Sequence, residues 1–272
     1  MPTIRPFRSK TARVATASER TLPSYTAGQV EMPLRIIGSQ EAMEHETYWS
    51  EHSHPTHELL WREAGVGTVT IDQRTWTITP PLGMWIPAGV RHSGWTPAGV
   101  VVYAAQFSLD NPLVSDRPTA IAITPLLRLL LDRLQHTDPG TSSYSLTEAM
   151  ILDVMTPADN ELLLHMPSNP LIAPIANAII EGPADASSLQ DWARKLGISG
   201  RTITRAFEAE TGLGFGRWAT TARIQHAVSM ISLGGEVDEA AAGVGYRSVS
   251  AFTTAFKRIT GTTPGQFRPS AN

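Results

Sequence analysis

Apolar and polar side chains alternate strictly in two short stretches of the N-terminal half. Val69 and Ile71 alternate with threonines, and Trp76 and Ile78 do the same after a short polar segment. Strict alternation is typical of a strand that buries one face, and two such strands joined by a few polar residues form a hairpin. The pattern therefore predicts a β-hairpin over residues 68–79.

Further short strands are predicted on either side of this hairpin. Proline and glycine separate them at residues 80–83 and 87–89, and the last strand lies in the apolar run 100–107. Many short strands with such turns are typical of a small antiparallel barrel or sandwich. We therefore expect a β-rich domain over residues 29–112. The preceding residues 1–28 are polar and lack periodicity, so they are expected to be a flexible basic arm.

The alternation stops after residue 112, and two helices are predicted within residues 113–164. The first carries leucines at helical spacing, namely Leu126, Leu127, Leu130, Leu131 and Leu134. The second covers residues 145–155, with an apolar face formed by Leu146, Met150 and Ile151. Such faces serve equally well for packing against the β-rich domain and for joining two copies of the chain. This segment is therefore a helical linker and a candidate dimerisation region.

From residue 165 onwards the apolar positions follow helical spacing throughout. Four sets fit the pattern i, i+3, i+4, i+7, and they begin at Leu189, Ile224, Val237 and Phe252. Four matches to one pattern indicate a compact all-helical domain over residues 165–272. The predicted architecture is thus α+β, with a β-rich N-terminal domain and a helical C-terminal domain.

Residues 196–212 and 244–261 repeat one pattern inside this helical domain. In each stretch an apolar helix ends at a glycine, a serine is placed to cap a second helix, and that helix ends at a Thr-Gly pair. Two helices joined in this way form a helix-turn-helix motif, whose second helix lies in the major groove of DNA. The helix expected between the motifs, residues 217–232, would be about 24 Å long. A separation of about one turn of DNA between the motifs is therefore plausible.

The apolar positions of each second helix determine which side chains face outwards. Ile203 and Phe207 must face the core of the first motif, and Phe252 and Phe256 do so in the second. Arginine can bond guanine with two hydrogen bonds, whereas serine, threonine and valine suit polar edges and thymine methyl groups. The candidate base-reading residues are Arg201, Thr204, Arg205, Val249, Ser250 and Thr254.

Residues 188–268 resemble the AraC/XylS family of bacterial transcription regulators. The resemblance rests on SLQDWARKLGISGRTITRAFEAETG, on the linker helix around Ala222-Arg223-Ile224, and on GYRSVSAFTTAFKRITGTTPGQFR. It implies two helix-turn-helix motifs on successive major-groove turns of double-stranded DNA. It also implies an N-terminal sensor for a small-molecule or metal effector, a homodimer, and RNA polymerase as a candidate partner. The small residues Ala240-Ala241-Ala242 depart from the larger apolar residue that is often seen in the family.

Four of the eight histidines lie between residues 52 and 92. His52, His54, Glu58 and His92 have the order and spacing of the metal site in cupin barrels, where imidazoles and a carboxylate bind a divalent ion such as Mn, Fe, Ni or Zn. His57 is an alternative to His52 as a ligand. Two departures from the cupin pattern are Glu46 in place of a glycine and Thr96 in place of an asparagine. Without metal, the same residues would line a pocket for an organic effector. The candidate effector-binding residues are His52, His54, His57, Glu58, Trp85 and His92, and Trp95 could also line the pocket.

Composition and charge refine this picture. The 272 residues contain no cysteine, which excludes a disulfide scaffold, thiol catalysis and a Cys-ligated zinc finger. The net charge of −3 conceals a segregation: residues 1–28 carry +4, residues 29–186 carry −11, and residues 187–272 carry +4. The near-neutral total therefore does not argue against a nucleic-acid partner.

The remaining alternative is a metal-dependent cupin enzyme, an oxygenase or isomerase with a helical appendage. No further acid-base set accompanies the histidines, and the duplicated motif is too specific for an appendage, so we expect a regulator and not an enzyme. The basic residues at the start of the sequence are not followed by an apolar segment, so a secretory signal is not expected, and the leucine-rich run 126–131 is far shorter than the roughly 20 residues that span a membrane. A cytoplasmic protein is expected.

Overall fold

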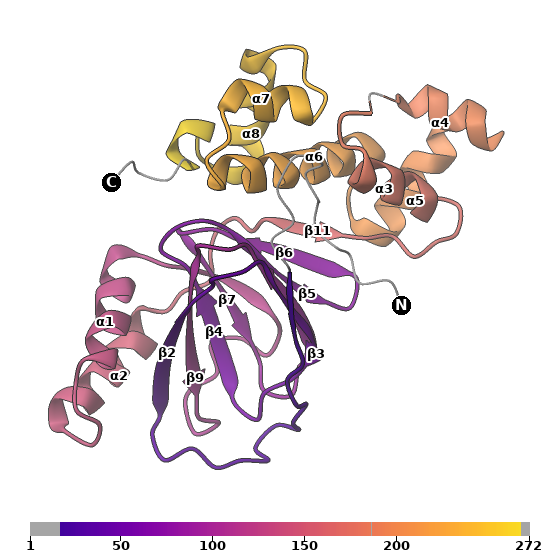
Figure 1. The fold of residues 1–272 in the computed structure, drawn as a ribbon. Coiled ribbons are helices and arrows are strands. Elements are labelled where there is room, and N and C mark those ends of the chain that lie inside the picture. Colours follow the sequence, from indigo (N-terminus) through magenta and orange to yellow (C-terminus); the bar gives the residue numbers. More distant parts are fainter. Residues whose placement is uncertain (1–16, 186, 268–272) are drawn as a thin grey trace. The chain divides into compact units, whose positions relative to one another are not determined.

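The computed structural model describes residues 17–185 and 187–267. The chain forms two compact units (Figure 1). The β-rich unit contains the described residues up to 161, apart from 73–75, and the helical unit consists mainly of the residues from 162 onwards. No helix within the described ranges has the length and apolar character needed to cross a membrane.

Ten strands of the β-rich unit form two sheets. They are β1 (Ser18–Arg20), β2 (Ile36–Ala42), β3 (Thr47–His52), β4 (His57–Trp61), β5 (Gly67–Ile71), β6 (Arg74–Ile78), β7 (Leu82–Ile86), β8 (His92–Thr96), β9 (Val101–Phe107) and β10 (Thr119–Ala122). One sheet has the order β1-β3-β8-β5-β6 and the other the order β10-β7-β4-β9-β2. The predicted β-rich domain is confirmed, but as two sheets and not as one closed barrel.

The predicted hairpin is formed by β5 and β6. Val69, Ile71, Trp76 and Ile78 are all buried, as the alternation requires. The turn places Asp72 at a positive φ of 53°. Aspartate tolerates this left-handed conformation better than most residues, so the turn residue suits the tight connection.

The two helices of the linker pack on the β-rich core. They are α1 (Pro125–Gln135) and α2 (Ser142–Val154). Leu127, Leu130, Leu131 and Leu134 join the cluster that contains Phe107. The helical segment 113–161 therefore belongs to the β-rich unit and is not a separate linker.

Three residues of the predicted apolar faces are exposed, namely Leu126, Leu146 and Met150. The buried positions of α2 include Tyr144, Glu148 and Ile151. Glu148 accepts a hydrogen bond from the backbone N–H of Ile36 at 2.9 Å, and Tyr144 donates to the Ile36 carbonyl at 2.6 Å. These two bonds rotate α2 so that polar side chains face the sheet, which an apolar pattern cannot indicate.

The expected flexible arm is only partly covered by the described residues. Residues 1–16 lie outside them. Residues 18–20 form β1, which pairs in parallel with β3, and the backbone N–H of Tyr25 donates to the Ser53 carbonyl at 3.1 Å. The part of the arm that is described is therefore attached to the β-rich unit.

The helical unit contains one short strand and seven helical segments within the described residues. They are β11 (Leu163–His165), α3 (Ala173–Glu181), α4 (Leu189–Leu196), α5 (Gly200–Thr211), α6 (Phe215–Ser232), α7 (Val237–Gly243), α8 (Val249–Thr260) and the 3-10 turn η1 (Pro264–Phe267). Two apolar clusters fill the unit, and α6 supplies residues to both. Trp218 and Ala222 belong to the first cluster, and Ile224 and Val228 belong to the second.

The sequence repeat is a repeat of local structure. Ser199 caps α5 and Ser248 caps α8, each through a side-chain oxygen that accepts a backbone N–H. At the other end, the Thr211 hydroxyl donates to the Phe207 carbonyl at 2.8 Å, and the Thr260 hydroxyl repeats this bond with Phe256 at 2.9 Å. Both helix-turn-helix motifs are thus confirmed, as α4-α5 and α7-α8.

One arginine of the central helix α6 bonds the segment that precedes α4. The guanidinium of Arg223 donates to the carbonyls of Pro183 and Asp185, at 3.0 and 2.7 Å. In the turn of the second motif, Gly245 has a φ of 83°, and a Cβ there would come within 3.0 Å of the Ala184 carbonyl oxygen. The segment before α4 therefore packs closely on the turn of the second motif.

Candidate functional site

The β-rich unit contains a partly open cavity of about 410 Å³ that is lined by residues of both sheets. Its walls follow from strand geometry, because every second side chain of a strand faces the same way. On the β4 side the alternate residues are Glu58, Leu60 and Arg62, and on β8 they are His92, Gly94 and Thr96. Although residues 29–186 carry a net negative charge, the cavity wall also contains a basic side chain, that of Arg62.

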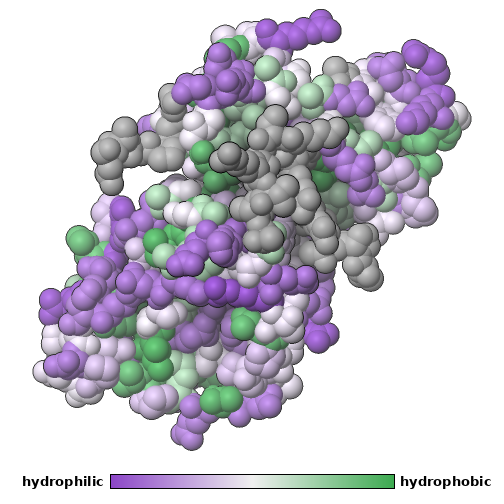
Figure 2. Space-filling view, viewed as in Figure 1, coloured by the Kyte–Doolittle hydropathy of each residue, from purple (hydrophilic) through white to green (hydrophobic). Residues whose placement is uncertain are grey.

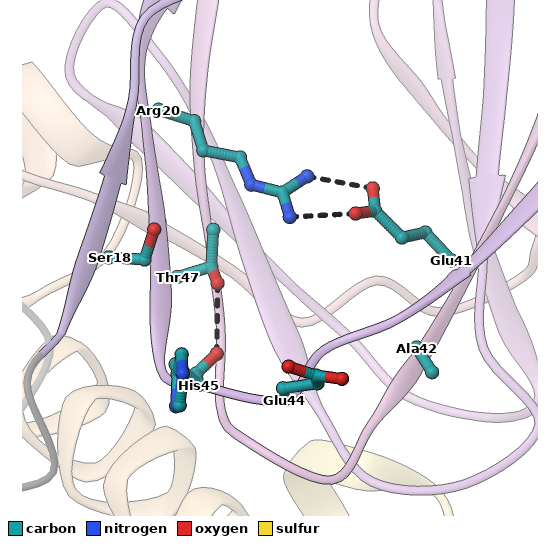
Figure 3. Close-up of a pocket in the computed structure, with 7 residues that line it drawn as sticks. All are labelled: Ser18, Arg20, Glu41, Ala42, Glu44, His45 and Thr47. Carbon is teal, nitrogen blue, oxygen red and sulfur yellow. Dashed lines mark hydrogen bonds and ion pairs between the residues drawn. The ribbon is translucent and has the colours of Figure 1, made fainter.

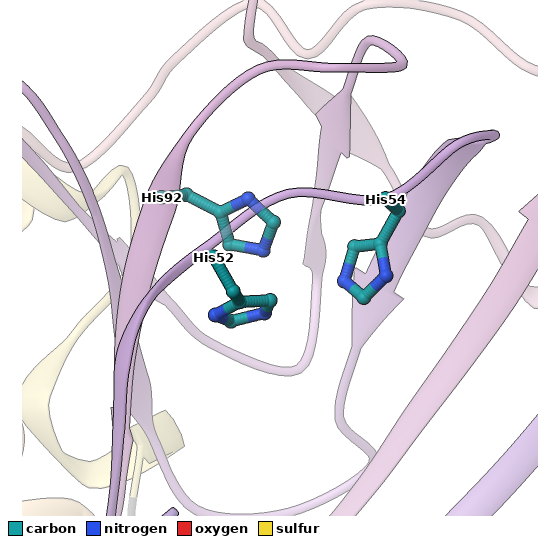
Figure 4. Close-up of side chains that lie close together, drawn as sticks. All are labelled: His52, His54 and His92. Atoms are coloured by element: carbon teal, nitrogen blue, oxygen red, sulfur yellow. The ribbon is translucent and has the colours of Figure 1, made fainter. Parts of the chain in front are cut away.

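Three histidines converge at one end of this cavity (Figure 4). One ring nitrogen from each of His52, His54 and His92 lies within 4.8 Å of the others. His52 and His92 are opposite each other in the β3–β8 register, next to an irregularity of that pairing. His54 follows two residues after His52, beyond the end of β3. The predicted histidine cluster is therefore brought together from two neighbouring strands and a loop.

Backbone carbonyls determine which nitrogen of two rings carries the proton. Nδ1 of His52 lies 2.7 Å from the Ser50 carbonyl, and Nδ1 of His92 lies 3.1 Å from the Val90 carbonyl. A carbonyl oxygen can only accept, so Nδ1 is the donor and Nε2 keeps a lone pair. Metal-binding histidines are commonly oriented by such a second hydrogen bond.

Glu58 adds a carboxylate oxygen to the cluster. Its Oε2 lies 3.5 Å from Nε2 of His54 and 3.6 Å from Nε2 of His92. Oε1 accepts a hydrogen bond from the Gln106 side chain at 2.7 Å, whereas buried Oε2 has no hydrogen-bond partner among the described residues. One carboxylate oxygen thus faces the imidazoles of His54 and His92 without a hydrogen-bond partner in the described part of the chain.

Burial controls the charge state of this cluster. Burial raises the pKa of Glu58 to about 7, although the hydrogen bond from Gln106 opposes this rise. Burial lowers the pKa of His92 to about 3 and also lowers the pKa values of His52 and His54. The imidazoles are therefore neutral near pH 7, and their contacts with Glu58 are not ion pairs. Neutral imidazoles and a carboxylate oxygen are suitable ligands for a divalent metal, so the donor set fits such an ion.

Two of the predicted effector-binding residues lie elsewhere. His57 neighbours Glu58 on β4 and therefore points to the opposite face, where its ring stacks on Trp85 at 5.2 Å. The backbone N–H of Ala88 donates to its Nδ1 at 3.0 Å. Trp85 is fully buried in the core, and its indole N–H donates to the Ser115 carbonyl at 2.9 Å. Neither side chain lines the cavity, whereas Trp95 does.

The cavity residues that were not predicted include Arg62, its hydrogen-bond partner Thr96, and Gln106. The signal for Arg62 was its place in the β4 alternation, four residues after Glu58. Thr96, noted only as a departure from the cupin pattern, accepts a hydrogen bond from the Arg62 guanidinium at 2.7 Å. The other departure, Glu46, accepts hydrogen bonds from Tyr48 and Trp95.

A second depression of about 250 Å³ lies beside β1 (Figure 3). Arg20 and Glu41 face each other there through two hydrogen bonds of 2.7 Å each. The hydrogen bond between them raises the pKa of Arg20 and lowers the pKa of Glu41. The charges of Arg20 and Glu41 compensate each other, whereas the Glu44 carboxylate also lines this depression.

The candidate base-reading residues lie where an outer face was expected. On α5, Arg201 and Arg205 are exposed and Thr204 is half-buried, while Ile203 and Phe207 face the core. On α8 the exposed residues are Val249, Ser250 and Thr254. The Thr254 hydroxyl donates to the Ser250 carbonyl at 3.0 Å, so this hydroxyl proton is already used within the helix.

Comparison with known proteins agrees with this division of the chain. Residues 37–148 match the AraC-like ligand binding domain, and residues 192–270 match a helix-turn-helix domain. The chain belongs to the AraC family of transcription regulators, with an N-terminal ligand-binding domain and a C-terminal helix-turn-helix DNA-binding domain.

Individual relatives are named as transcriptional regulators. The HTH-type transcriptional regulator NimR of Escherichia coli is 29% identical over 223 residues, which are 79% of this chain and 81% of NimR. The HTH-type transcriptional regulator RipA of Corynebacterium glutamicum is 36% identical over 215 residues, which are 77% of this chain and 61% of RipA. Among solved structures, ToxT from Vibrio cholerae O395 is similar with a TM-score of 0.35 and 12% identity, covering 86% of this chain and 96% of ToxT.

Proposed function

We propose that this regulator reads DNA bases with α5 and α8 and that a ligand in the cavity of the β-rich unit controls this reading. The observation that carries the proposal is the duplicated helix-turn-helix, in which both second helices keep an exposed face of residues that suit base edges. Recognition helices contact bases mainly through their first turns. Arg201 and Arg205 lie one turn apart near the start of α5, and Val249 and Ser250 begin α8.

The two helices differ in the chemistry that they offer to DNA. On α5, two guanidinium groups can each bond a guanine, and Thr204 can contact a neighbouring base or thymine methyl. On α8, Val249 and the methyl group of Thr254 suit thymine methyls, and Ser250 suits a polar edge or a phosphate. We therefore assign most of the base discrimination to α5 and a larger share of shape and methyl contacts to α8.

Selection of duplex DNA by the full-length chain tests this function. Random-sequence duplexes enriched by the protein are expected to share two half-sites about 10 to 10.5 base pairs apart. Their affinity should fall steeply as salt rises, because bound counterions are released from the phosphates. Enrichment of no common sequence, together with salt-independent binding, would refute a DNA-reading function.

We further propose that His52, His54, His92 and Glu58 hold a divalent metal ion in the β-rich unit. The proposal is supported by the lone pairs of the histidine Nε2 atoms and by the unpartnered Oε2 of Glu58. When bound, the ion would supply a positive centre to which a polar group of an effector can attach. The protein would then respond to the metal itself or to a metal-held effector.

A homodimer is proposed through the outer faces of α1 and α2. Leu129 and Leu146 are 67% and 64% exposed, and Leu126 and Met150 are exposed beside them on the same two helices. On the visible face of the β-rich unit, hydrophobic side chains are interspersed with hydrophilic ones (Figure 2). Exposed apolar residues gathered on two packed helices are typical of a protein–protein interface.

Replacing Leu129 and Leu146 together with glutamate is expected to convert a dimer into a monomer. Four like charges at the interface of two copies would have to be desolvated without partners. Sedimentation at micromolar concentration measures the state of association. A matched control is Leu233→Glu, which alters a 55% exposed leucine of the helical unit and should leave the dimer intact. A monomeric unaltered protein, or a dimeric double variant, would contradict this interface.

A further inference from the structure

Arg62 is a buried arginine whose hydrogen-bonding capacity is mostly unused. It follows directly after β4, is only 3% exposed, and lines the cavity. Its Nη2 donates to the Thr96 hydroxyl at 2.7 Å, but the buried Nε and Nη1 find no hydrogen-bond partner in the described part of the chain. The guanidinium lies against Gly67, where a Cβ would come within 2.2 Å of Nη2. Only a glycine leaves space for the side chain in this position.

Comparison with Arg20 shows how unusual this arrangement is within the same unit. Arg20 has a 38% exposed side chain and a carboxylate partner on both terminal nitrogens. Arg62 is buried and has only a neutral hydroxyl as partner. Burial lowers the pKa of Arg62 to about 10, so the group still carries its charge at neutral pH. An uncompensated buried charge is costly, and such a charge persists where a ligand compensates it.

The cavity places Arg62 opposite the histidine cluster. Glu58 and Arg62 are four residues apart along the β4 direction, and His92 and Thr96 are four apart on β8. At about 3.3 Å per residue, either pair spans about 13 Å. Between the two ends, Leu60 and Gly94 line the wall, and Ala104 pairs with Leu60 from β9. The cavity therefore has one end with the Arg62 guanidinium, where Glu41 also lines the wall but is already paired with Arg20, an apolar middle and a histidine-rich end.

We propose that the effector of this cavity is an organic acid whose carboxylate pairs with Arg62 and whose apolar body lies along Leu60, Gly94 and Ala104. The proposal rests on the ligand-sensing function proposed above and names the ligand class. A guanidinium binds a carboxylate through two parallel hydrogen bonds, donated by Nη2 together with either Nε or Nη1. Nη2 keeps one N–H beyond its bond to Thr96, and the adjacent Nε or Nη1 has no partner among the described residues, so one such pair of donors is free for a ligand. The apolar middle favours a carboxylate with a hydrocarbon body over inorganic phosphate.

Calorimetric titration of the full-length chain tests the proposal with matched probes. The probes are benzoate, phenylacetate and hexanoate, each beside its neutral primary amide, together with inorganic phosphate. We expect the carboxylates to bind about tenfold or more tightly than the amides, because an amide cannot compensate the buried charge. Phosphate should bind more weakly than the organic acids. This comparison needs no variant and therefore does not depend on the folding of one.

Variants then locate the carboxylate. Arg62→Met should abolish the preference for carboxylates over amides and keep a melting temperature equal to or above that of the unaltered protein, because a buried charge is removed. Arg62→Lys should retain part of the preference, since the charge remains while the two-pronged donor is lost. The matched control Arg128→Met changes an exposed arginine of α1 and should bind the probes normally.

Several outcomes would overturn the assignment. They are equal binding of acids and amides by the unaltered chain, no binding of any carboxylate probe, binding of phosphate alone, and an undiminished carboxylate preference in Arg62→Met. Loss of that preference in His92→Ala but not in Arg62→Met would place the carboxylate at the histidine cluster instead. If this proposal fails while the chain still binds DNA sequence-selectively, the proposed regulator function is not affected.

Discussion

Protein in which His92 is replaced by alanine is expected to bind divalent metal at least about 100-fold more weakly than the unaltered chain. His92 supplies one of three imidazole nitrogens that lie within 4.8 Å of one another. Loss of a group that only orients a metal-binding side chain already lowers the metal affinity by about 10- to 100-fold, so loss of a metal-binding side chain should lower it at least as much. Metal content after dialysis against Mn, Fe, Ni or Zn salts, measured by elemental analysis, gives the comparison.

The control for this experiment is His136→Ala. His136 directly follows α1 and has a 72% exposed side chain, so its loss removes a histidine without touching the proposed site. The metal should also raise the melting temperature of the unaltered protein, because it binds only the folded arrangement. Equal metal content and equal stabilisation in His92→Ala would rule out a metal site at these residues.

Replacing Arg201 or Arg205 with alanine is expected to lower the affinity for a selected DNA site by about 1–3 kcal/mol, or about 5- to 150-fold. Each exposed guanidinium of α5 can make two hydrogen bonds to one guanine, and alanine removes both. The base preference should relax at one position of the half-site for each variant. Equilibrium binding to the selected site and to its single-base variants, at fixed salt, measures both effects.

Arg194→Ala serves as the matched control for the DNA experiment. Arg194 is an arginine of α4 with a 79% exposed side chain paired to Asp191, and it lies outside the proposed recognition helix. Its loss should change the affinity little and leave the base preference unaltered. If the α5 variants weakened binding to all sequences equally, the two arginines would contact phosphates and not bases. If they left binding unchanged, α5 would not be the reading helix.

The helical unit was predictable because its signals are local. The capping serines, the glycine turns and the Thr-Gly helix ends act within a few residues of chain, so each motif is recognisable in its own sequence. Ser199 and Thr211 make the bonds that their positions suggested. The exposed face of each recognition helix followed from the same apolar spacing, because that spacing leaves few alternatives for what faces inwards.

The β-rich unit was less predictable because its contacts are distant in sequence. The orientation of α2 depends on Glu148 bonding Ile36, 112 residues away. The spacing predicts the histidine cluster, but His57, a candidate effector-binding residue, does not line the cavity. The alternation of a strand already separates His57 from Glu58, and the same rule joins Arg62 to Glu58. Strict use of this alternation excludes His57 from the cavity wall and places Arg62 in it.

The length of α6 has a consequence for how this regulator can change its target. An added residue in a helix turns everything beyond it by about 100° and moves it by about 1.5 Å. Seven added residues would nearly restore the orientation of the second motif but displace it by about 10.5 Å, roughly three base pairs of DNA. Three base pairs turn the groove by about 100°, because a full turn takes 10 to 10.5 pairs. The length of the 18-residue α6 is therefore constrained, because the period of an α-helix does not match the helical repeat of DNA. New targets are accordingly more accessible through changes on the surfaces of α5 and α8 than through a change in the spacing between them.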